Sequence, residues 1–260
     1  TFAVVNEVGA YGRPRVQTKF IFMTDNKMRT EILTIDKGQC LTDVLPAIPA
    51  NTIFDKTITG CGATHSEIVN AARHSIIIEP NIPVILGKKA EHPFLFAVYE
   101  GITKEDVKAY LAGEHDGYRK IITTPEGFDK KVLPAMHELE IPVYKDYFLL
   151  FDECEKAIQD VGYRGDIYLP VEDFFKFENK AMVSATPIVP SDPRFEENGF
   201  KILKLVPTYD SRIELTLCTT NNTVAVMRKL LKRLENETVC VFLNSTETIL
   251  SLIYALGLQG

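Results

Sequence analysis

The chain has 260 residues, of which 45% are hydrophobic and 25% are charged, and its formal net charge is −6. This profile is typical of a globular protein with one large domain or one and a half. The negative balance excludes nucleic-acid binding through an overall basic character, so such binding would need local patches such as Arg119–Lys120 or Lys130–Lys131.

The cysteine spacing and the length of the apolar runs indicate the kind of compartment in which the chain is expected. The five cysteines are scattered, and no two of them have the CxxC spacing of zinc or redox sites. Such a set predicts the cytoplasm or another reducing compartment rather than a disulfide scaffold. No apolar run approaches the roughly 18 residues that a membrane-spanning helix needs, so no membrane partner is expected.

The first 40 residues hold two alternating stretches, VQTKFIFMT (16–24) and MRTEILTI (28–35). The polar residues Asp25, Asn26 and Lys27 between them are typical of a turn. We therefore expect residues 1–40 to form an N-terminal β-hairpin extension.

Strand and helix patterns alternate through residues 41–206. Strands are expected at 53–59, 75–79, 120–123, 147–151 and 181–184. Helices are expected at 64–72, 104–111, 128–139 and 171–175, the third of them kinked or broken at Pro134. This alternation predicts an α/β fold with a mainly parallel sheet covered by helices on both faces. Ligands of such folds bind at the carboxyl ends of the strands.

The strand and helix patterns of residues 207–260 predict a second unit. Strands are expected at 212–219 and 239–243, and helices at 224–234 and 246–256. The first of these helices carries an apolar stripe opposite a basic face, which indicates packing against a neighbour.

The run FLLFDECEKA (147–156) ends a buried strand in adjacent carboxylates, Asp152 and Glu153. Two carboxylates buried there without partners would be costly, so they indicate the edge of a site. An aspartate in this position suits Mg²⁺, and the glutamate after it suits the handling of an attacking water. A solvated strand end is the alternative.

Two further motifs flank this run, TITGCGATHSE (57–67) before it and MVSATPI (182–188) after it. In this order the three motifs resemble the superfamily 2 helicases of the DEAD/DEAH type, which have RecA-like domains, and the resemblance covers roughly residues 45–256. Gly60 and Gly62 match the glycines of the family's phosphate loop, and residues 152–155 match its DExx box.

The resemblance implies ATP and Mg²⁺ as cofactors. Asp152 and Thr64 would hold the metal, and Glu153 would activate the attacking water. The residues expected to surround the phosphates are Thr59, Gly60, Cys61, Gly62, Ala63 and Thr64. Backbone N–H groups at the start of the following helix would point at the anion.

The resemblance also implies a nucleic-acid partner, DNA or RNA. Ser184, Ala185 and Thr186 match the motif that couples the nucleotide site to nucleic acid. The segment IITTPEG (121–127) is similar to the family's Thr-Pro-Gly segment, with Glu126 intruding. The residues expected to face the nucleic-acid backbone are Pro80, Asn81, Thr124 and Pro125.

One departure from the family concerns Ala63, where the family has the lysine that reaches the β- and γ-phosphates. A methyl group cannot replace that cation, and the mostly neutral His65 is a poor substitute. Three alternatives remain: a natural degenerate site, an engineered change, or rescue by Lys56 or another residue. We expect ATP hydrolysis to be slow or absent, and Ala63→Lys to raise triphosphate affinity.

The second unit would be the opening of another RecA-like domain, with VCVFLNS (239–245) at the family's fourth motif and no counterpart of its arginine fingers. Two other functions stay open. A non-catalytic RecA-like module could bind a nucleotide or a protein partner. An NAD-type oxidoreductase could use Gly60 to Gly62 for pyrophosphate and Glu79 for ribose, although His65 occupies the third glycine position.

Overall fold

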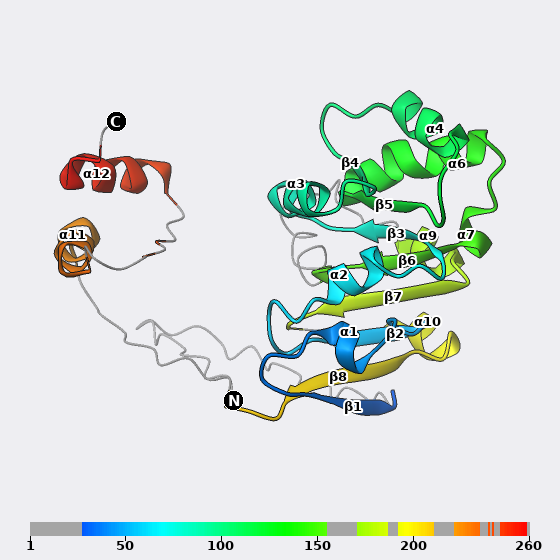
Figure 1. Ribbon diagram of the computed structural model, residues 1–260, viewed down its shortest axis with the longest axis horizontal. Helices are drawn as coiled ribbons and strands as arrows, with labels where there is room; N and C mark the ends of the chain where they lie inside the picture. Colours follow the sequence, from blue (N-terminus) through cyan, green and yellow to red (C-terminus); the bar gives the residue numbers. More distant parts are fainter. Residues whose placement is uncertain are drawn as a thin grey trace, which may run out of the picture. The chain divides into compact units, whose positions relative to one another are not determined.

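The computed structural model describes residues 28–154, 171–186, 192–210, 221–234, 239, 241 and 245–258. The chain divides into two compact units, Thr1–Ser211 and Arg212–Gly260. Figure 1 shows the sheet in the first unit and two helices in the second. The predicted strands at 16–24 and 212–219, and most of that at 239–243, lie outside the described residues.

The described part of the first unit forms one eight-stranded sheet in the order β1-β8-β2-β7-β6-β3-β5-β4. Every pairing in it is parallel. The strands are β1 Thr30–Ile35, β2 Thr52–Asp55, β3 His74–Ile78, β4 Phe96–Val98, β5 Lys120–Thr123, β6 Tyr147–Phe151, β7 Asn179–Ser184 and β8 Lys201–Pro207. The predicted α/β fold with a mainly parallel sheet is confirmed.

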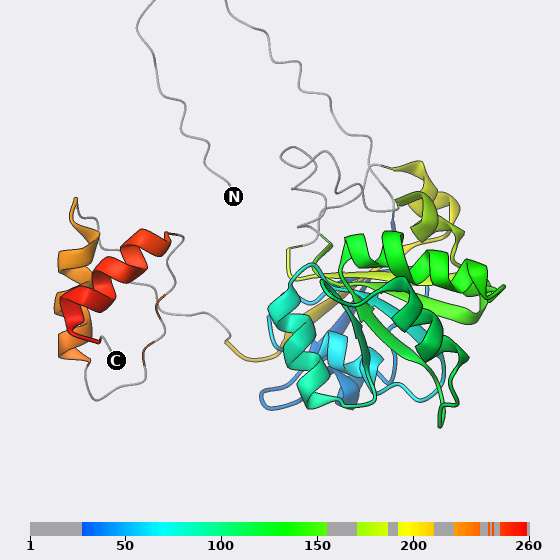
Figure 2. The ribbon, with the colours of Figure 1, turned by 90° about the horizontal axis from the view of Figure 1, so that it is seen from above.

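Helices cover both faces of this sheet (Figure 2). One face packs against α4 Lys104–Ala112, η1 Phe128–Val132, α6 Leu133–Glu138, α7 Val143–Asp146, α9 Val171–Lys176 and α10 Pro193–Glu197. The other face packs against α1 Leu41–Val44, α2 Ala63–Ile68 and α3 Ile82–Glu91. The short α5 Pro125–Gly127 leads directly into η1.

The central strand β6 shows why the sheet is buried on both faces. Leu149 and Phe151 belong to the apolar core on one side, and Phe148 and Leu150 belong to the core on the other. Successive side chains of a strand point to opposite faces, so a continuous apolar run suits a strand between two helical layers.

The strand β1 lies at one edge of the same sheet and pairs in parallel with β8. The second arm of the predicted N-terminal hairpin, residues 28–35, thus belongs to the sheet that carries the motifs. The first arm lies outside the described residues, so the hairpin itself stays a prediction.

Two predicted elements are shorter in the structure, and several helices were not predicted, among them α1, α3, α7 and α10. The strand expected at 53–59 ends at Asp55, and the helix expected at 64–72 ends at Ile68. The segment after Glu79, where no helix was predicted, contains α3. Pro83 does not prevent this helix because it lies in the first turn, where no intrahelical donor is needed.

The helix expected at 128–139 is not broken by Pro134. The helical run from 125 to 138 continues through the π-helical turn η1, in which the Leu133 N–H donates to the Phe128 carbonyl. A proline removes one backbone donor and crowds the preceding turn. The wide turn directly before Pro134 accommodates both effects.

The second unit contains α11 Thr223–Arg233 and α12 Thr246–Leu256, which contact each other. Both helices were predicted, at 224–234 and 246–256. The side chains of Asn222 and Ser245 cap their first turns. Among the described residues, no helix is long and apolar enough to cross a membrane.

Candidate functional site

The carboxyl ends of the central strands bring several charged residues to one edge of the sheet. The parallel hydrogen-bond pattern continues one residue beyond each strand. The Lys56 N–H donates to the Ser184 carbonyl, the Asp152 N–H to the Ile78 carbonyl, and the Glu79 N–H to a carbonyl of β5, each at 2.9 Å. The backbone therefore fixes the three charged residues along the same edge.

The glycine loop follows β2 at this edge. Gly60 and Gly62 have φ angles of 75° and 88°, in the left-handed region that favours glycine. Gly62 is the residue before the first turn of α2. Thr59 and Gly60 are exposed, whereas Cys61 is buried. The loop thus presents its glycine backbone to solvent and anchors itself through apolar side chains.

Asp152 lies against this loop. The Thr64 hydroxyl donates to Asp152 Oδ2, and Lys56 Nζ lies 3.1 Å from Asp152 Oδ1. The Glu153 N–H donates to Oδ1 at 2.9 Å. Asp152 is only 2% exposed, and these donors explain how its charge tolerates burial. The motif order predicts this proximity of loop and DExx box.

Two non-glycine residues at the site have left-handed backbones, Thr57 with a φ of 43° and Glu153 with a φ of 47°. They directly follow Lys56 and Asp152, the two partners of the ion pair. The Ile58 N–H donates to the Lys56 carbonyl across Thr57, which closes a three-residue turn. Such backbone conformations are costly and cluster at functional sites.

Asn81 joins two glutamates at this edge. Its side-chain amide donates to Glu153 Oε2 at 2.7 Å and to Glu79 Oε1 at 2.9 Å. Burial raises the pKa of Glu79 to about 7, and the charges of Asp152 and Glu153 act in the same direction, against the hydrogen bonds from Asn81. The protonated and the ionised forms of Glu79 are therefore both populated near neutral pH.

The pKa of Lys56 is raised. Burial alone would lower this pKa, but the charge and hydrogen bond of Asp152, together with the charge of Glu153, outweigh the effect of burial. The side chain of Lys56, 13% exposed, therefore carries its positive charge at neutral pH.

The residues expected to couple or contact nucleic acid lie near the same edge. The hydroxyl oxygen of Ser184 accepts from the Thr186 N–H at 2.9 Å. The Thr124 hydroxyl accepts from the Gly127 N–H at 3.0 Å and caps α5. Asn81 is engaged with the two glutamates. The roles of these residues, and of Ala185, Pro80 and Pro125, stay predictions.

The oxygen atoms of Asp152 and Thr64 are hard ligands that suit Mg²⁺. Magnesium is usually bound through one or two protein oxygens together with water and substrate phosphates. The described residues contain no group of three or more His, Cys, Asp or Glu side chains placed to hold a metal. Asp152 and Thr64 are therefore donors that would fit a Mg²⁺ ion whose remaining ligands are water or phosphate.

The structure brings Asp152 and Thr64 into contact, as the order of the motifs predicts, and it places three further residues beside them, Lys56, Glu79 and Asn81. Lys56 was considered only as one possible rescue, Glu79 only for an NAD site, and Asn81 only for nucleic acid. A charged residue directly after a buried strand is the shared signal for Lys56, Glu79 and Asp152.

The strand order argues against the dinucleotide site. The strands that lead to the glycine loop and to Glu79 are β2 and β3, and β7 and β6 lie between them. The dinucleotide fingerprint places its acidic residue at the end of the strand next to the one that carries the glycine loop. Glu79 therefore does not occupy that position.

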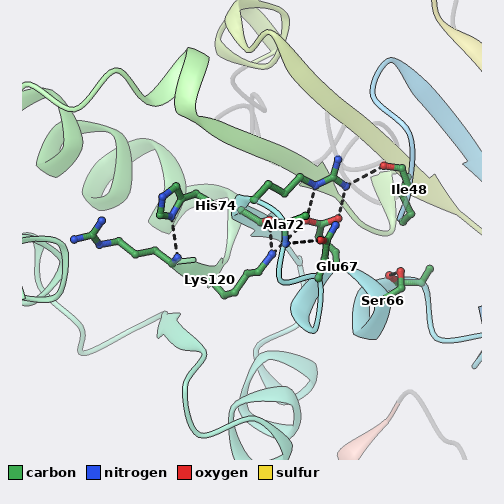
Figure 3. A network of polar contacts seen from close by, with 11 residues as sticks. Ile48, Ser66, Glu67, Ala72, His74 and Lys120 are labelled. Atoms are coloured by element: carbon green, nitrogen blue, oxygen red, sulfur yellow. Dashed lines mark hydrogen bonds and ion pairs between the residues drawn. The ribbon is translucent and has the colours of Figure 1, made fainter. Parts of the chain in front are cut away.

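A buried polar network holds the far end of α2, at the amino edge of the sheet. Arg73 Nε donates to Glu67 Oε1 at 3.0 Å, and Arg73 Nη2 donates to the Ile48 carbonyl at 2.9 Å. The Ser75 hydroxyl also donates to Glu67, and Lys120 Nζ donates to Ser75 at 2.9 Å. Figure 3 shows Glu67 at the centre of these contacts.

This network ties the loop helix to two strands. Glu67 belongs to α2, Ser75 to β3 and Lys120 to β5. The side chains of Glu67 and Lys120 are 0% and 3% exposed, and Nζ lies 3.6 Å from Oε1. The network fixes the direction in which α2 leaves the glycine loop.

No family model matches the chain. No curated protein matches it either.

Two solved helicase structures are similar to the chain. The DUF1998 helicase MrfA has a TM-score of 0.54 and 14% identity, covering 80% of this chain and 36% of that one. The Hef helicase domain of Pyrococcus furiosus has 12% identity and covers 88% and 50% of the two chains, but its TM-score of 0.39 is too low to support an argument. This chain thus spans about a third of the length of MrfA. The MrfA likeness, together with the parallel sheet, shows a RecA-like α/β fold.

Proposed function

We propose that the chain is an ATP-dependent helicase- or translocase-like protein that binds ATP with Mg²⁺ at the carboxyl edge of its sheet. The observation that carries this proposal is the contact between the Thr64 hydroxyl and Asp152 Oδ2. It joins the glycine loop to the DExx segment, and a single Mg²⁺–phosphate unit must touch both in an ATP site.

The roles of the residues follow from their positions. Backbone N–H groups of residues 59–64 would surround the phosphates, and Asp152 and Thr64 would hold Mg²⁺, which neutralises charge on the β- and γ-phosphates. Glu153 would orient or deprotonate the attacking water. Its carboxylate is held by Asn81 at 2.7 Å.

Nucleic acid is the proposed second ligand, because MrfA, a solved structure that shares the fold, is described as a helicase. The segments carrying Pro80–Asn81 and Thr124–Pro125 lie side by side, since the Glu79 N–H donates to the Thr123 carbonyl at 2.9 Å. With a net charge of −6, we expect weak binding that falls steeply with salt concentration.

Hydrolysis of radiolabelled ATP under single-turnover conditions tests this function. We expect slow, Mg²⁺-dependent hydrolysis that single-stranded DNA or RNA accelerates. Replacing a catalytic base costs about 10²- to 10⁴-fold in rate, so Glu153→Gln should lose at least about 100-fold.

The exposed Glu91→Gln serves as the matched control and should hydrolyse ATP like the original chain. Hydrolysis that survives Glu153→Gln would contradict the assigned role. Failure of the chain to bind any nucleotide would contradict the function itself.

A further inference from the structure

The glycine loop has no cation of its own at the position where the resemblance expects one. Ala63 is 4% exposed and belongs to the apolar core that contains Leu41 and Ile68. The next residue but one, His65, places Nδ1 3.2 Å from Nε2 of His92, the C-cap residue of α3. The methyl group of Ala63 therefore offers no positive charge to a phosphate held by the loop.

Lys56 brings a positive charge to the same place from the strand before the loop. Its Nζ lies 3.1 Å from Asp152 Oδ1, and the other oxygen of Asp152 accepts from the Thr64 hydroxyl. The charge therefore lies beside the two residues expected to hold Mg²⁺.

The backbone on both sides holds the base of this side chain in place. The Lys56 N–H donates to the Ser184 carbonyl at 2.9 Å, and the strained Thr57, with a φ of 43°, follows it. The four-carbon stem beyond Cα remains flexible, so Nζ can move while its base stays fixed.

We propose that Lys56 supplies the positive charge at the β- and γ-phosphates that the loop lacks at position 63. This inference rests on the proposed binding of MgATP at this edge. Asp152 would hold Mg²⁺ when the metal is bound, and Lys56 would then turn its ammonium from this carboxylate toward the phosphate oxygens.

A purely structural ion pair is the competing explanation. In that case Lys56 only neutralises the buried Asp152, and its removal would lower stability without weakening nucleotide binding. Removal of Lys56 could even strengthen Mg²⁺ binding, because its ammonium would no longer compete with the metal for Asp152. The two explanations differ in how the affinities for ATP and AMP change, because AMP has no β- or γ-phosphate.

The test measures binding of ATP and AMP, each with Mg²⁺, to the full chain and to Lys56→Met. We expect Lys56→Met to weaken ATP binding by about 10- to 100-fold, the range of a hydrogen bond to a charged group, and to leave AMP binding nearly unchanged. Lys56→Arg should keep most of the affinity. Lys204→Met is the matched control, since Lys204 lies 3.7 Å from Asp55 and is 46% exposed.

Thermal melting of each variant separates loss of folding from loss of binding. A folded Lys56→Met that binds ATP as tightly as the original chain, or that loses ATP and AMP affinity equally, would overturn the inference. If the original chain binds no nucleotide, the proposed function fails instead.

A measurement on the original chain covers the case in which Lys56→Met does not fold. Labelling of lysine amines, read by mass spectrometry, should increase at Lys56 with Mg²⁺ alone and decrease with MgATP but not with MgAMP. Equal labelling of Lys56 under all these conditions would also overturn the inference.

Discussion

Asp152 is the residue on which the site converges. Its carboxylate accepts hydrogen bonds from the strand before the glycine loop, from the loop helix and from its own neighbour, through Lys56, Thr64 and Glu153. A buried carboxylate needs such donors to stay charged. In the proposed site, Mg²⁺ would bind this carboxylate in place of the ammonium and of the hydroxyl hydrogen.

Glu79 gives a prediction about stability and pH. Its pKa is raised from the ordinary 4.5 to about 7 in the folded protein. Between these values the folded state keeps a proton that the unfolded state loses, so the free energy of unfolding falls as the pH rises from 4.5 to 7. Glu79→Gln removes this loss, which amounts to about 3 kcal/mol.

Urea unfolding without Mg²⁺ measures this effect. Relative to the original chain, Glu79→Gln should be more stable at pH 8 than it is at pH 5. The exposed Glu91→Gln should show no such gain at pH 8. An identical difference between Glu79→Gln and the original chain at both pH values would contradict the burial of a protonatable Glu79.

For single residues, the sequence predicts which chemical groups form the site better than it predicts which of these groups touch one another. The adjacency of Asp152 and Thr64 could be predicted because the two motifs define it. The contact of Lys56 with Asp152 could not, because it depends on β7 lying between β2 and β6. That order is set by long-range pairing rather than by any local pattern.

Among the elements, α5 depends on its last residue, Gly127, for its close approach to β5. A Cβ atom at Gly127 would lie 2.5 Å from Thr123 Oγ1 and 3.3 Å from the Val98 carbonyl oxygen. Gly127→Ala should therefore destabilise the protein by about 1–3 kcal/mol, the usual cost of overpacking, in spite of the better helix propensity of alanine.

Gly87→Ala in α3 is the matched control, since its Cβ would meet nothing within 4 Å. It should stabilise the protein by about 0.5–1 kcal/mol through helix propensity alone. Chemical denaturation of both variants measures the difference. Equal effects would show that the contact at Gly127 is not a constraint.

The network behind α2 gives a second prediction at this scale. Glu67→Gln leaves the cations of Arg73 and Lys120 without their buried carboxylate. The free energy of unfolding should fall by about 3–5 kcal/mol, as when one partner of a buried ion pair is removed. Because α2 follows the glycine loop, nucleotide affinity should fall as well.

The exposed pair of Glu126 and Lys130 provides the control. Glu126→Gln should change the free energy of unfolding little, because solvent screens exposed pairs. A small effect of Glu67→Gln, no larger than that of Glu126→Gln, would show that the network does not hold α2.

The bounds of β5, β6 and α12 agree with those predicted from the sequence. The strands β4 and β8 and the helix α3 were not predicted. β8 carries lysines and ends at Pro207, so its sequence alone does not indicate a strand. It forms one because β1 and β2 pair with it on either side, and tertiary pairing overrides weak local preference.

For the whole molecule, the class of fold follows from the sequence but the order of its strands does not. Alternating strands and helices predict a parallel sheet. Pairing of β1 with β8 joins segments from opposite ends of the first unit, and no local signal specifies such contacts. The comparison with MrfA, at 14% identity, bears on the fold alone.

Calorimetric titration of ATP into the original chain and into Asp152→Asn, with and without Mg²⁺, tests the central claim most directly. We expect saturable binding to the original chain that Mg²⁺ strengthens, because Asp152 and Thr64 hold the metal against the phosphates. In a folded Asp152→Asn the strengthening by Mg²⁺ should disappear. ATP binding that is absent in the original chain, or that Mg²⁺ strengthens equally in Asp152→Asn, would contradict a magnesium–nucleotide site at this edge.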